Sequence, residues 1–250
     1  MTLRALCTRL LLPVVALVTC AASPAIAAWP NSPLVNVPVC TAMGDQLGPT
    51  GIPDGAGGTI VAWFDERAGI GNGDIYAQRI SATGTPLWAA SGVALCTAGG
   101  EQTIPVILSD GMGGAIVAWL DRRNSSWNLY AQRISADGSV QWTADGVALC
   151  TPTASQVARA SIASDGLGGA IVTWFDVRSG SWDVYAQRIS AAGALQWTAG
   201  GVVLCAATND QDHPSIAPDG AGGAIVAWED GRSGYYTDIY AQRISANGTV

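Results

Sequence analysis

The chain has 250 residues, of which 49% are hydrophobic and 12% charged, with a formal net charge of −7. That much apolar material is enough to fill the core of one or two domains. The chain contains no lysine and no basic run, which argues against nucleic-acid binding.

Residues 1–27 have the pattern of a secretory signal peptide. Arg4 and Arg9 precede an apolar run, and the small residues of "AIA" end the segment. We therefore expect a mature chain that starts at residue 28 and is secreted or held at the cell surface. A lipoprotein anchor at Cys20 is the alternative. No later stretch reaches ~18 continuous apolar residues, so no membrane span is expected.

The rest of the chain repeats one pattern with "DG" pairs at residues 54, 110, 165 and 219, which are 54 to 56 residues apart. Each repeat holds four segments of strand character: "GGAIVAW", "DIYAQRI", a segment ending in "GVALC", and one resembling "HPSIAP". Turn residues separate them, and no helical period is present. Four strands in a repeat of this length match one propeller blade. We predict an all-β propeller over residues 28–250, with four blades or as a four-blade part of a larger ring.

The two ends of this region resemble complementary halves of one repeat. The sequence stops two segments into the repeat that starts at residue 219, and residues 28–53 match the two segments that are missing there. We expect the terminal strands to pair and close the ring, which would remove exposed sheet edges. The alternative is that the chain is a fragment of a longer propeller.

The repeat also resembles a known family. The run DGxGGAIVAWxDxR, followed by DIYAQRI and a tryptophan, is similar to repeats of exported bacterial proteins that are taken to form β-propellers, and the likeness covers residues 40–250. This resemblance implies a fold and no activity. A looser similarity links "SADGSVQW" at residues 135–142 to the Asp-box turn of sialidase-type propellers, although its glycine comes one position early.

Each repeat places an aspartate after the first segment and an arginine two positions later. Because residues two apart on a strand share a face, we interpret them as structural ion pairs, with each other or with an arginine of the second segment. A repeated anion or calcium site is the alternative. The pairs are Asp65 and Arg67, Asp121 and Arg123, Asp176 and Arg178, and Asp230 and Arg232; the second-segment arginines are Arg79, Arg133, Arg188 and Arg243.

Tryptophans and cysteines also recur at fixed places. We expect the tryptophan rings to fill the space between blades. Equivalent cysteines of neighbouring blades should lie too far apart to bridge, so free buried thiols are expected, with disulfides or a four-thiolate metal site as alternatives. No metal or cofactor is predicted. The residues are Trp63, Trp119, Trp174 and Trp228 in the first segment, Trp88, Trp142 and Trp197 in the third, and Cys40, Cys96, Cys150 and Cys205.

Function is expected where the copies differ. The loop between the first two segments varies and brings aromatic side chains and an arginine to one rim, where they suit a glycan or a protein partner. The alternative is that these rings only cover blade edges. The candidates for ligand binding are Trp127, Trp182, Tyr235, Tyr236 and Arg122.

His213 is the only histidine of the chain and lies between Asp212 and Ser215. Residues this close in sequence do not converge as a catalytic triad must. We expect an exposed loop histidine, with a calcium loop in "NDQD" as the alternative. Gly48, Ile104 and Arg159 occupy the same place in the other repeats.

These observations favour a monomeric, non-catalytic binding or scaffold propeller for an unknown protein or glycan. The alternative is a sialidase-like hydrolase whose catalytic carboxylates are non-repeated residues such as Glu66, Glu101 or Asp212. Loss of one carboxylate would spare binding and abolish catalysis, whereas loss of the rim aromatics would do the reverse.

Overall fold

The computed structural model describes residues 29–151 and 157–250, so the predicted signal peptide and Cys20 lie outside the described residues. The described residues form fifteen β-strands and no helix. Consequently this part of the chain contains no helix that is long and apolar enough to cross a membrane.

The strands form four antiparallel sheets, of which three have four strands and the last has three. The first blade is β1 (Gln46–Pro53), β2 (Thr59–Asp65), β3 (Asp74–Ile80) and β4 (Val93–Cys96), and the second is β5 (Gln102–Ser109), β6 (Ala115–Asp121), β7 (Asn128–Ile134) and β8 (Val147–Cys150). The third blade is β9 (Val157–Ser164), β10 (Ala170–Asp176), β11 (Asp183–Ile189) and β12 (Val202–Cys205). The fourth consists of β13 (Gln211–Pro218), β14 (Ala224–Asp230) and β15 (Asp238–Ile244).

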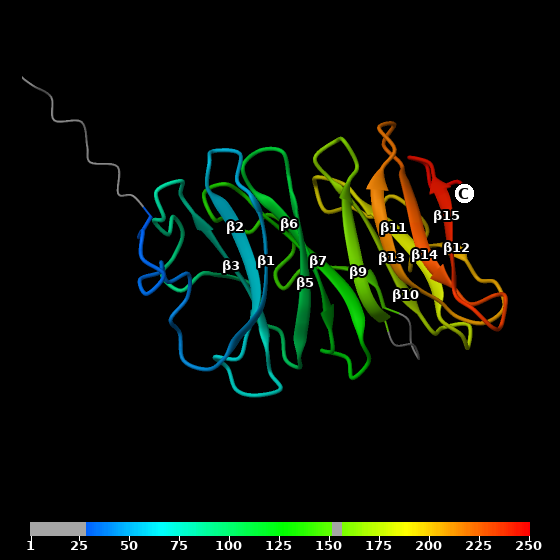
Figure 1. Ribbon diagram of the computed structural model, residues 1–250, viewed down its shortest axis with the longest axis horizontal. Helices are drawn as coiled ribbons and strands as arrows, with labels where there is room; N and C mark the ends of the chain where they lie inside the picture. The colour runs from blue at the N-terminus through cyan, green and yellow to red at the C-terminus, as the bar shows by residue number, and fades with distance from the viewer. Residues whose placement is uncertain (1–28, 152–156) are drawn as a thin grey trace, which may run out of the picture.

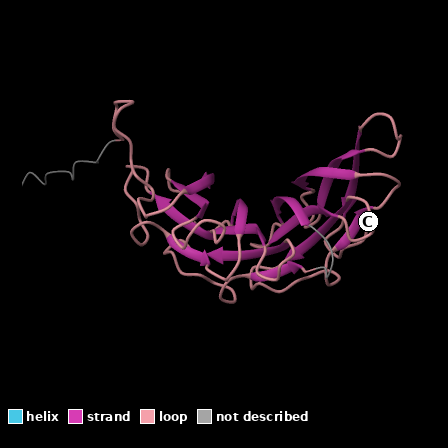
Figure 2. Ribbon diagram, turned by 90° about the horizontal axis from the view of Figure 1, so that it is seen from below, coloured by secondary structure: helices cyan, strands magenta, loops and turns pink. Residues whose placement is uncertain are grey.

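The sheets follow one another along an open crescent (Figures 1 and 2). The first strand of each blade contacts the first strand of the next, which is the place of the axis-lining strands in a propeller. The predicted all-β propeller fold is confirmed. The apolar runs β6 and β10 are buried along their whole length, as expected for strands packed between neighbouring blades.

The blades begin earlier in the sequence than the "DG" pairs suggest. The segment resembling "HPSIAP" was expected to end a repeat, but it forms the first strand of the following sheet. The reason is the short turn at the pair itself: Asp110 Oδ1 accepts hydrogen bonds from the backbone N–H groups of Met112 and Gly114, at 2.8 and 2.9 Å, and closes a hairpin between β5 and β6. The first blade therefore has four strands and the fourth, within the described residues, has three; the pairing of terminal strands that was expected to close the ring is not formed there.

The third segment is also shorter than expected, because its tryptophan lies in a loop and only "VALC" or "VVLC" forms a strand. Trp88 Nε1 and Arg79 Nη1 both donate to the carbonyl oxygen of Ala136 in the next blade, at 3.1 and 3.0 Å. The ring lies against Gly138, where a Cβ would come within 2.8 Å of it. We call this arrangement the blade joint. It recurs where Arg133 and Trp142 meet Ala191, and where Arg188 and Trp197 meet Ala246.

A second repeated network surrounds the aspartate that ends the second strand of each blade. In the second blade Asp121 accepts hydrogen bonds from Trp119 Nε1 at 3.0 Å and from Arg123 Nε at 2.8 Å. The Arg123 guanidinium lies 3.9 Å from the centroid of the Tyr130 ring. The predicted ion pairs form in all four blades, Asp65 with Arg67, Asp121 with Arg123, Asp176 with Arg178 and Asp230 with Arg232. Arg79, Arg133, Arg188 and Arg243 pair instead with the aspartates of the "DG" turns, Asp54, Asp110, Asp165 and Asp219.

The four repeated cysteines are free thiols. Each sulfur accepts a hydrogen bond from the network arginine of the next blade, as between Cys96 Sγ and Arg123 Nη2 at 3.2 Å. The thiols therefore help to join one blade to the next. The same contact joins Cys40 to Arg67, Cys150 to Arg178 and Cys205 to Arg232.

Candidate functional site

The first strand of every blade carries a bulge at the same position. The pairing register shifts there, as it does between Asp212 and Ser215 on β13. The bulged residue has a left-handed backbone and is exposed in each blade, with φ of 58° at Gly48, 50° at Ile104, 35° at Arg159 and 49° at His213. Three of these four residues are not glycine, and a left-handed conformation costs such residues of order 1–3 kcal/mol each. The bulge is therefore an architectural feature that holds one exposed side chain per blade.

The chemistry around the bulge differs sharply among blades. The relevant positions are, in this order, the residue before the bulge, the bulged residue, and the residue on the second strand that pairs with the first of these. In blade order they hold Leu47, Gly48 and Phe64; Thr103, Ile104 and Leu120; Ala158, Arg159 and Phe175; and Asp212, His213 and Glu229. Only the fourth blade places three ionisable groups there.

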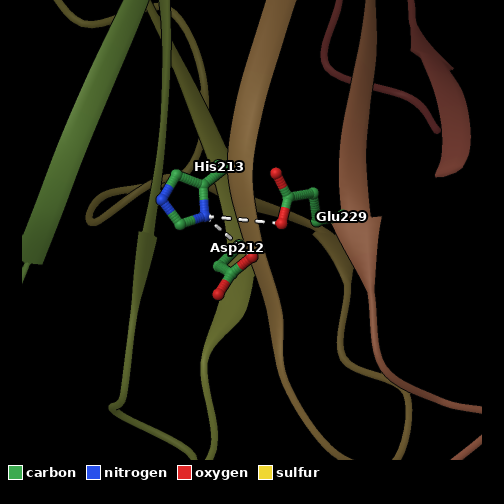
Figure 3. Close-up of side chains that lie close together, drawn as sticks. All are labelled: Asp212, His213 and Glu229. Atoms are coloured by element: carbon green, nitrogen blue, oxygen red, sulfur yellow. Dashed lines mark hydrogen bonds and ion pairs between the residues drawn. The ribbon is translucent and has the colours of Figure 1, made fainter. Parts of the chain in front are cut away.

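These three side chains converge (Figure 3). Asp212 and Glu229 are direct partners across β13 and β14. His213 Nδ1 lies 3.0 Å from Asp212 Oδ1 and 3.9 Å from Glu229 Oε2, and one oxygen of each carboxylate lies within 4.8 Å of the other. The side chains are 29%, 45% and 50% exposed for Asp212, His213 and Glu229. The site thus holds two solvent-accessible carboxylates, each with an oxygen near the same imidazole nitrogen.

Aromatic rings of the third blade border this cluster. The Phe175 ring lies 5.6 Å from the His213 ring, and Trp182 meets Phe175 edge-on with centroids 4.9 Å apart. The backbone N–H of Trp182 donates to Asp210 Oδ1 at 3.1 Å, which ties the third-blade loop to the start of the fourth blade. The cluster and the rings together form one surface across two blades.

Of the five rim residues predicted to bind ligand, the structure brings only Trp182 to this surface. Arg122 lies over the Trp127 ring at 5.7 Å in the second blade. Tyr235 and Tyr236 contact each other with centroids 4.6 Å apart and are strongly exposed on the fourth blade. The predicted rim therefore does not form one continuous site.

The carboxylates expected for the hydrolase alternative also separate. Glu66 borders a shallow hollow with Gly44 and Ile70 in the first blade. Glu101 precedes β5 in the second blade, where its carbonyl oxygen accepts the N–H of Arg122 at 2.8 Å. Only Asp212 belongs to the convergent cluster.

Sequence reasoning missed Glu229 as the partner of Asp212. The two residues are far apart along the chain, and only the antiparallel register brings them together. A signal was available, since the position after the first-segment tryptophan holds phenylalanine or leucine in the other repeats. The expectation of a loop histidine was wrong: His213 is exposed but lies on β13.

The cluster is also the one group of three His, Cys, Asp or Glu side chains, within the ranges that the structure describes, with ligand atoms close enough to share a metal ion. Imidazole and carboxylate donors suit divalent transition metals. However, the hydrogen bond to Asp212 already engages His213 Nδ1.

No protein-family model and no curated protein matches the chain. Among solved structures it is similar to an endo-arabinase from Bacteroides thetaiotaomicron, at 15% identity over 81% of this chain and 76% of that one, with a TM-score of 0.44. It is also similar to an α-L-arabinanase from Penicillium chrysogenum, at 12% identity over 74% of this chain and 56% of that one, with a TM-score of 0.45. A third is an α-L-arabinofuranosidase from Fusarium graminearum, at 12% identity over the same shares, with a TM-score of 0.44.

The expectation of a non-catalytic binding or scaffold module is corrected by these comparisons. The solved propellers to which the chain is similar are named as glycan-cleaving enzymes. The likeness itself extends to the fold alone. Any activity of this chain has to be argued from its own side chains.

Proposed function

We propose that the protein is a carbohydrate-active hydrolase whose catalytic pair is Asp212 and Glu229. The observation that carries this proposal is the convergence of two accessible carboxylates at the single bulge where the propeller departs from its repeat. Glycoside hydrolysis generally requires two such carboxyl groups on either side of the scissile bond. The predicted signal peptide accords with an enzyme that acts on glycans outside the cell.

The spacing favours a mechanism that retains the configuration of the anomeric carbon. Retaining enzymes hold their carboxyl groups roughly 5–5.5 Å apart, whereas inverting enzymes need roughly 6.5–9.5 Å to admit a water molecule. In this site one oxygen of each carboxylate lies within 4.8 Å of the other. The facing oxygens thus lie closer together than the separation that inverting enzymes need.

The surroundings assign a role to each group. Asp212 is the less exposed of the two and is held by His213, so its carboxylate is fixed for attack on the anomeric carbon. Glu229 is half exposed and, in the described part of the chain, makes no hydrogen bond with its side chain. It is free to protonate the departing glycosidic oxygen and then to deprotonate the water that releases the sugar.

The aromatic border supplies a binding surface for the sugar. Phe175 and Trp182 present ring faces and edges beside the carboxylates. Apolar ring surfaces of this kind pack against the C–H faces of sugars while the hydroxyl groups remain in water. Loss of Trp182 is therefore expected to raise KM more than it lowers kcat.

The test is hydrolysis of a panel of aryl glycosides and polysaccharides, arabinan among them, by the purified chain and four carboxylate variants. We expect the Asp212→Asn and Glu229→Gln variants to lose roughly 10²–10⁴-fold in kcat, the range for removal of a general acid or base. NMR of the first product should show retained anomeric configuration.

Glu66→Gln and Glu101→Gln are the matched controls, because both are carboxylates of the sequence-based hypothesis that lie outside the cluster. They should keep the activity of the unmodified chain. Equal losses in all four variants, or hydrolysis that persists in Glu229→Gln, would contradict the assignment. Absence of any product across the panel would argue against a hydrolase of these substrates.

A further inference from the structure

Arg159 differs from the other arginines of the protein in having no charge partner. Most arginines in the described ranges form ion pairs with aspartates, and Arg122 lies over the Trp127 ring. Within those ranges Arg159 makes neither contact, and the residues outside them include no aspartate or glutamate that could pair with it. An exposed guanidinium is therefore unpaired in a chain whose formal net charge is −7.

The backbone of β9 presents this arginine at the bulge of the third blade. Arg159 has a φ of 35° and occupies the place that His213 has in the fourth blade. A left-handed backbone strains any residue except glycine, and Gly48 holds the same place in the first blade. The third blade thus keeps a charged side chain on the exposed face where a glycine would be less strained.

The bulges of the third and fourth blades lie side by side. Strands β9 and β13 are neighbours in the structure (Figure 1), and Ser161 Oγ donates to the carbonyl oxygen of Pro214 at 2.8 Å. Pro214 directly follows His213, and Arg159 comes two residues before Ser161, so its Cα is at most ~7 Å from that of Ser161. Arg159 is therefore at the same level of the propeller as His213.

Phe175 connects the two bulges. It pairs with Ala158, the residue before Arg159, across β9 and β10. Its ring lies 5.6 Å from the ring of His213, which in turn holds Asp212 with a hydrogen bond of 3.0 Å. Arg159 and the carboxylates thus belong to one surface, with the cation on the third blade and the acids on the fourth.

We propose that the glycan bound at Asp212 and Glu229 contains uronate sugars, and that Arg159 binds one of their carboxylates. This inference rests on the proposed function of that pair and names its class of substrate. A guanidinium presents its N–H groups in a planar fork that matches the two oxygens of a carboxylate. Arg159 therefore acts as a specificity-determining residue beside the catalytic pair.

The charges around the site explain why an anionic glycan would need this residue. Asp212 and Glu229 repel a carboxylate that approaches them, and Asp210, whose Oδ1 accepts the N–H of Trp182, adds a third negative charge at the border. The charge of Arg159 is not neutralised by an aspartate, so it can offset this repulsion. A neutral glycan would gain no comparable interaction.

Calorimetric titration of the Glu229→Gln chain with three oligosaccharides tests the proposal. The probes are an oligogalacturonate, a neutral arabino-oligosaccharide and a neutral oligosaccharide that has been sulfated. We expect the oligogalacturonate to bind roughly tenfold or more tightly than the other two, and an added Arg159→Gln change to remove the preference. Arg159→Lys should restore only part of it, because lysine keeps the charge without the planar fork.

Arg122→Gln is the matched control, since Arg122 is also exposed and also lacks an ion pair but lies in the second blade. It should leave all three affinities unchanged. In the chain with its carboxylates intact, Arg159→Gln should raise KM for polygalacturonate roughly tenfold or more with little change in kcat. Unfolding midpoints of both variants, equal to that of the unmodified chain, would show that the fold is not the cause.

The outcomes separate this inference from the proposed function. Equal binding of the uronate and neutral probes, tighter binding of the sulfated probe, or no binding of any probe would overturn the role of Arg159. Cleavage of neutral arabinan without binding of the oligogalacturonate would do the same and leave the hydrolase assignment in place. Binding of the oligogalacturonate that depends on Arg159, with no cleavage of any glycan, would support the uronate site and contradict the hydrolase.

Discussion

In the second blade the bulged first strand exposes Ile104, with Thr103 before it and Leu120 opposite. In the fourth blade the same backbone exposes His213, with carboxylates in both flanking places. The hydrogen-bond networks beneath are alike, since Trp119, Asp121 and Arg123 have their counterparts in Trp228, Asp230 and Arg232. The comparison distinguishes two parts of each blade. The repeated hydrogen-bond network of tryptophan, aspartate and arginine, which we call the frame, is the same in every blade, whereas the residues at the three positions around the bulge differ.

This separation explains how a repeat protein acquires a single site. The frame fixes the bulge and its left-handed backbone in each blade, and it does so without help from the residues on the exposed face. Substitutions at those positions alter chemistry without loss of the fold. If the frame and the site are independent, substitutions in the frame should change stability in every blade, and substitutions around the bulge of the fourth blade should change hydrolysis without loss of the fold.

The largest effect should follow from breaking the frame. Asp121→Ala leaves the Arg123 guanidinium without its carboxylate inside the interblade network, and we expect a loss of roughly 3–5 kcal/mol in the free energy of unfolding, the cost of removing one partner of a buried pair. Asp230→Ala in the fourth blade should cost less, because the Arg232 side chain is 34% exposed against 19% for Arg123. Urea unfolding of both variants measures the difference. Equal losses in the free energy of unfolding would mean that the exposure of the arginine does not affect how much this network stabilises the blade.

A second prediction concerns a place where the first and second blades differ. Asp74 is buried where the second blade has Asn128, and desolvation together with the nearby charge of Asp65 raises the pKa of Asp74 to about 6. Because the pKa is raised in the folded protein, ionisation destabilises the fold: the cost is absent below pH 4, grows as the pH rises to 6, and is complete above it. A shift from 3.8 to about 6 corresponds to about 3 kcal/mol.

Asp74→Asn, which copies the second blade, should therefore stabilise the protein by up to about 3 kcal/mol at neutral pH and by almost nothing at pH 3.5. Unfolding midpoints measured across this pH range give the answer. A gain that is the same at both pH values would show that the buried charge is not its cause.

The smallest effect is expected from the bulge itself. His213→Gly copies the first blade, where Gly48 adopts the left-handed backbone without strain. We expect a gain of about 1 kcal/mol in stability together with a loss of hydrolysis, since Asp212 loses its hydrogen bond. Ile104→Gly is the matched control and should change stability alone. If both variants retained full hydrolysis, His213 would have no part in the proposed site.

Much of the fold was predictable from the sequence because its repeats report the same local structure four times. The "DG" turns, the buried "GGAIVAW" strands and the Asp–Arg pairs all follow from turn chemistry and side-chain alternation. The strand at which each blade begins was not predictable in the same way. A repeat has no intrinsic start, and the hairpin closed by Asp110 decides which strand belongs to which sheet.

The candidate site was less accessible to sequence reasoning. Asp212 and His213 were visible as a departure from the repeat, but Glu229 becomes their neighbour only through the register of β13 with β14. Phe175 and Trp182 join them from another blade, and no local pattern encodes that contact. Comparison of equivalent positions, rather than a search for motifs, is the step that would have found the pair.

The repeated thiols have a consequence for the chemistry of oxidation. Burial raises the pKa of Cys96 and Cys150 to about 12, although the adjacent arginines oppose the shift. The reactive species in thiol–disulfide exchange is the thiolate, and at neutral pH almost none is present at these two sulfurs. A folded chain in an oxidising compartment should therefore keep them reduced for as long as the blades stay together, and their alkylation would report the rate at which neighbouring blades separate.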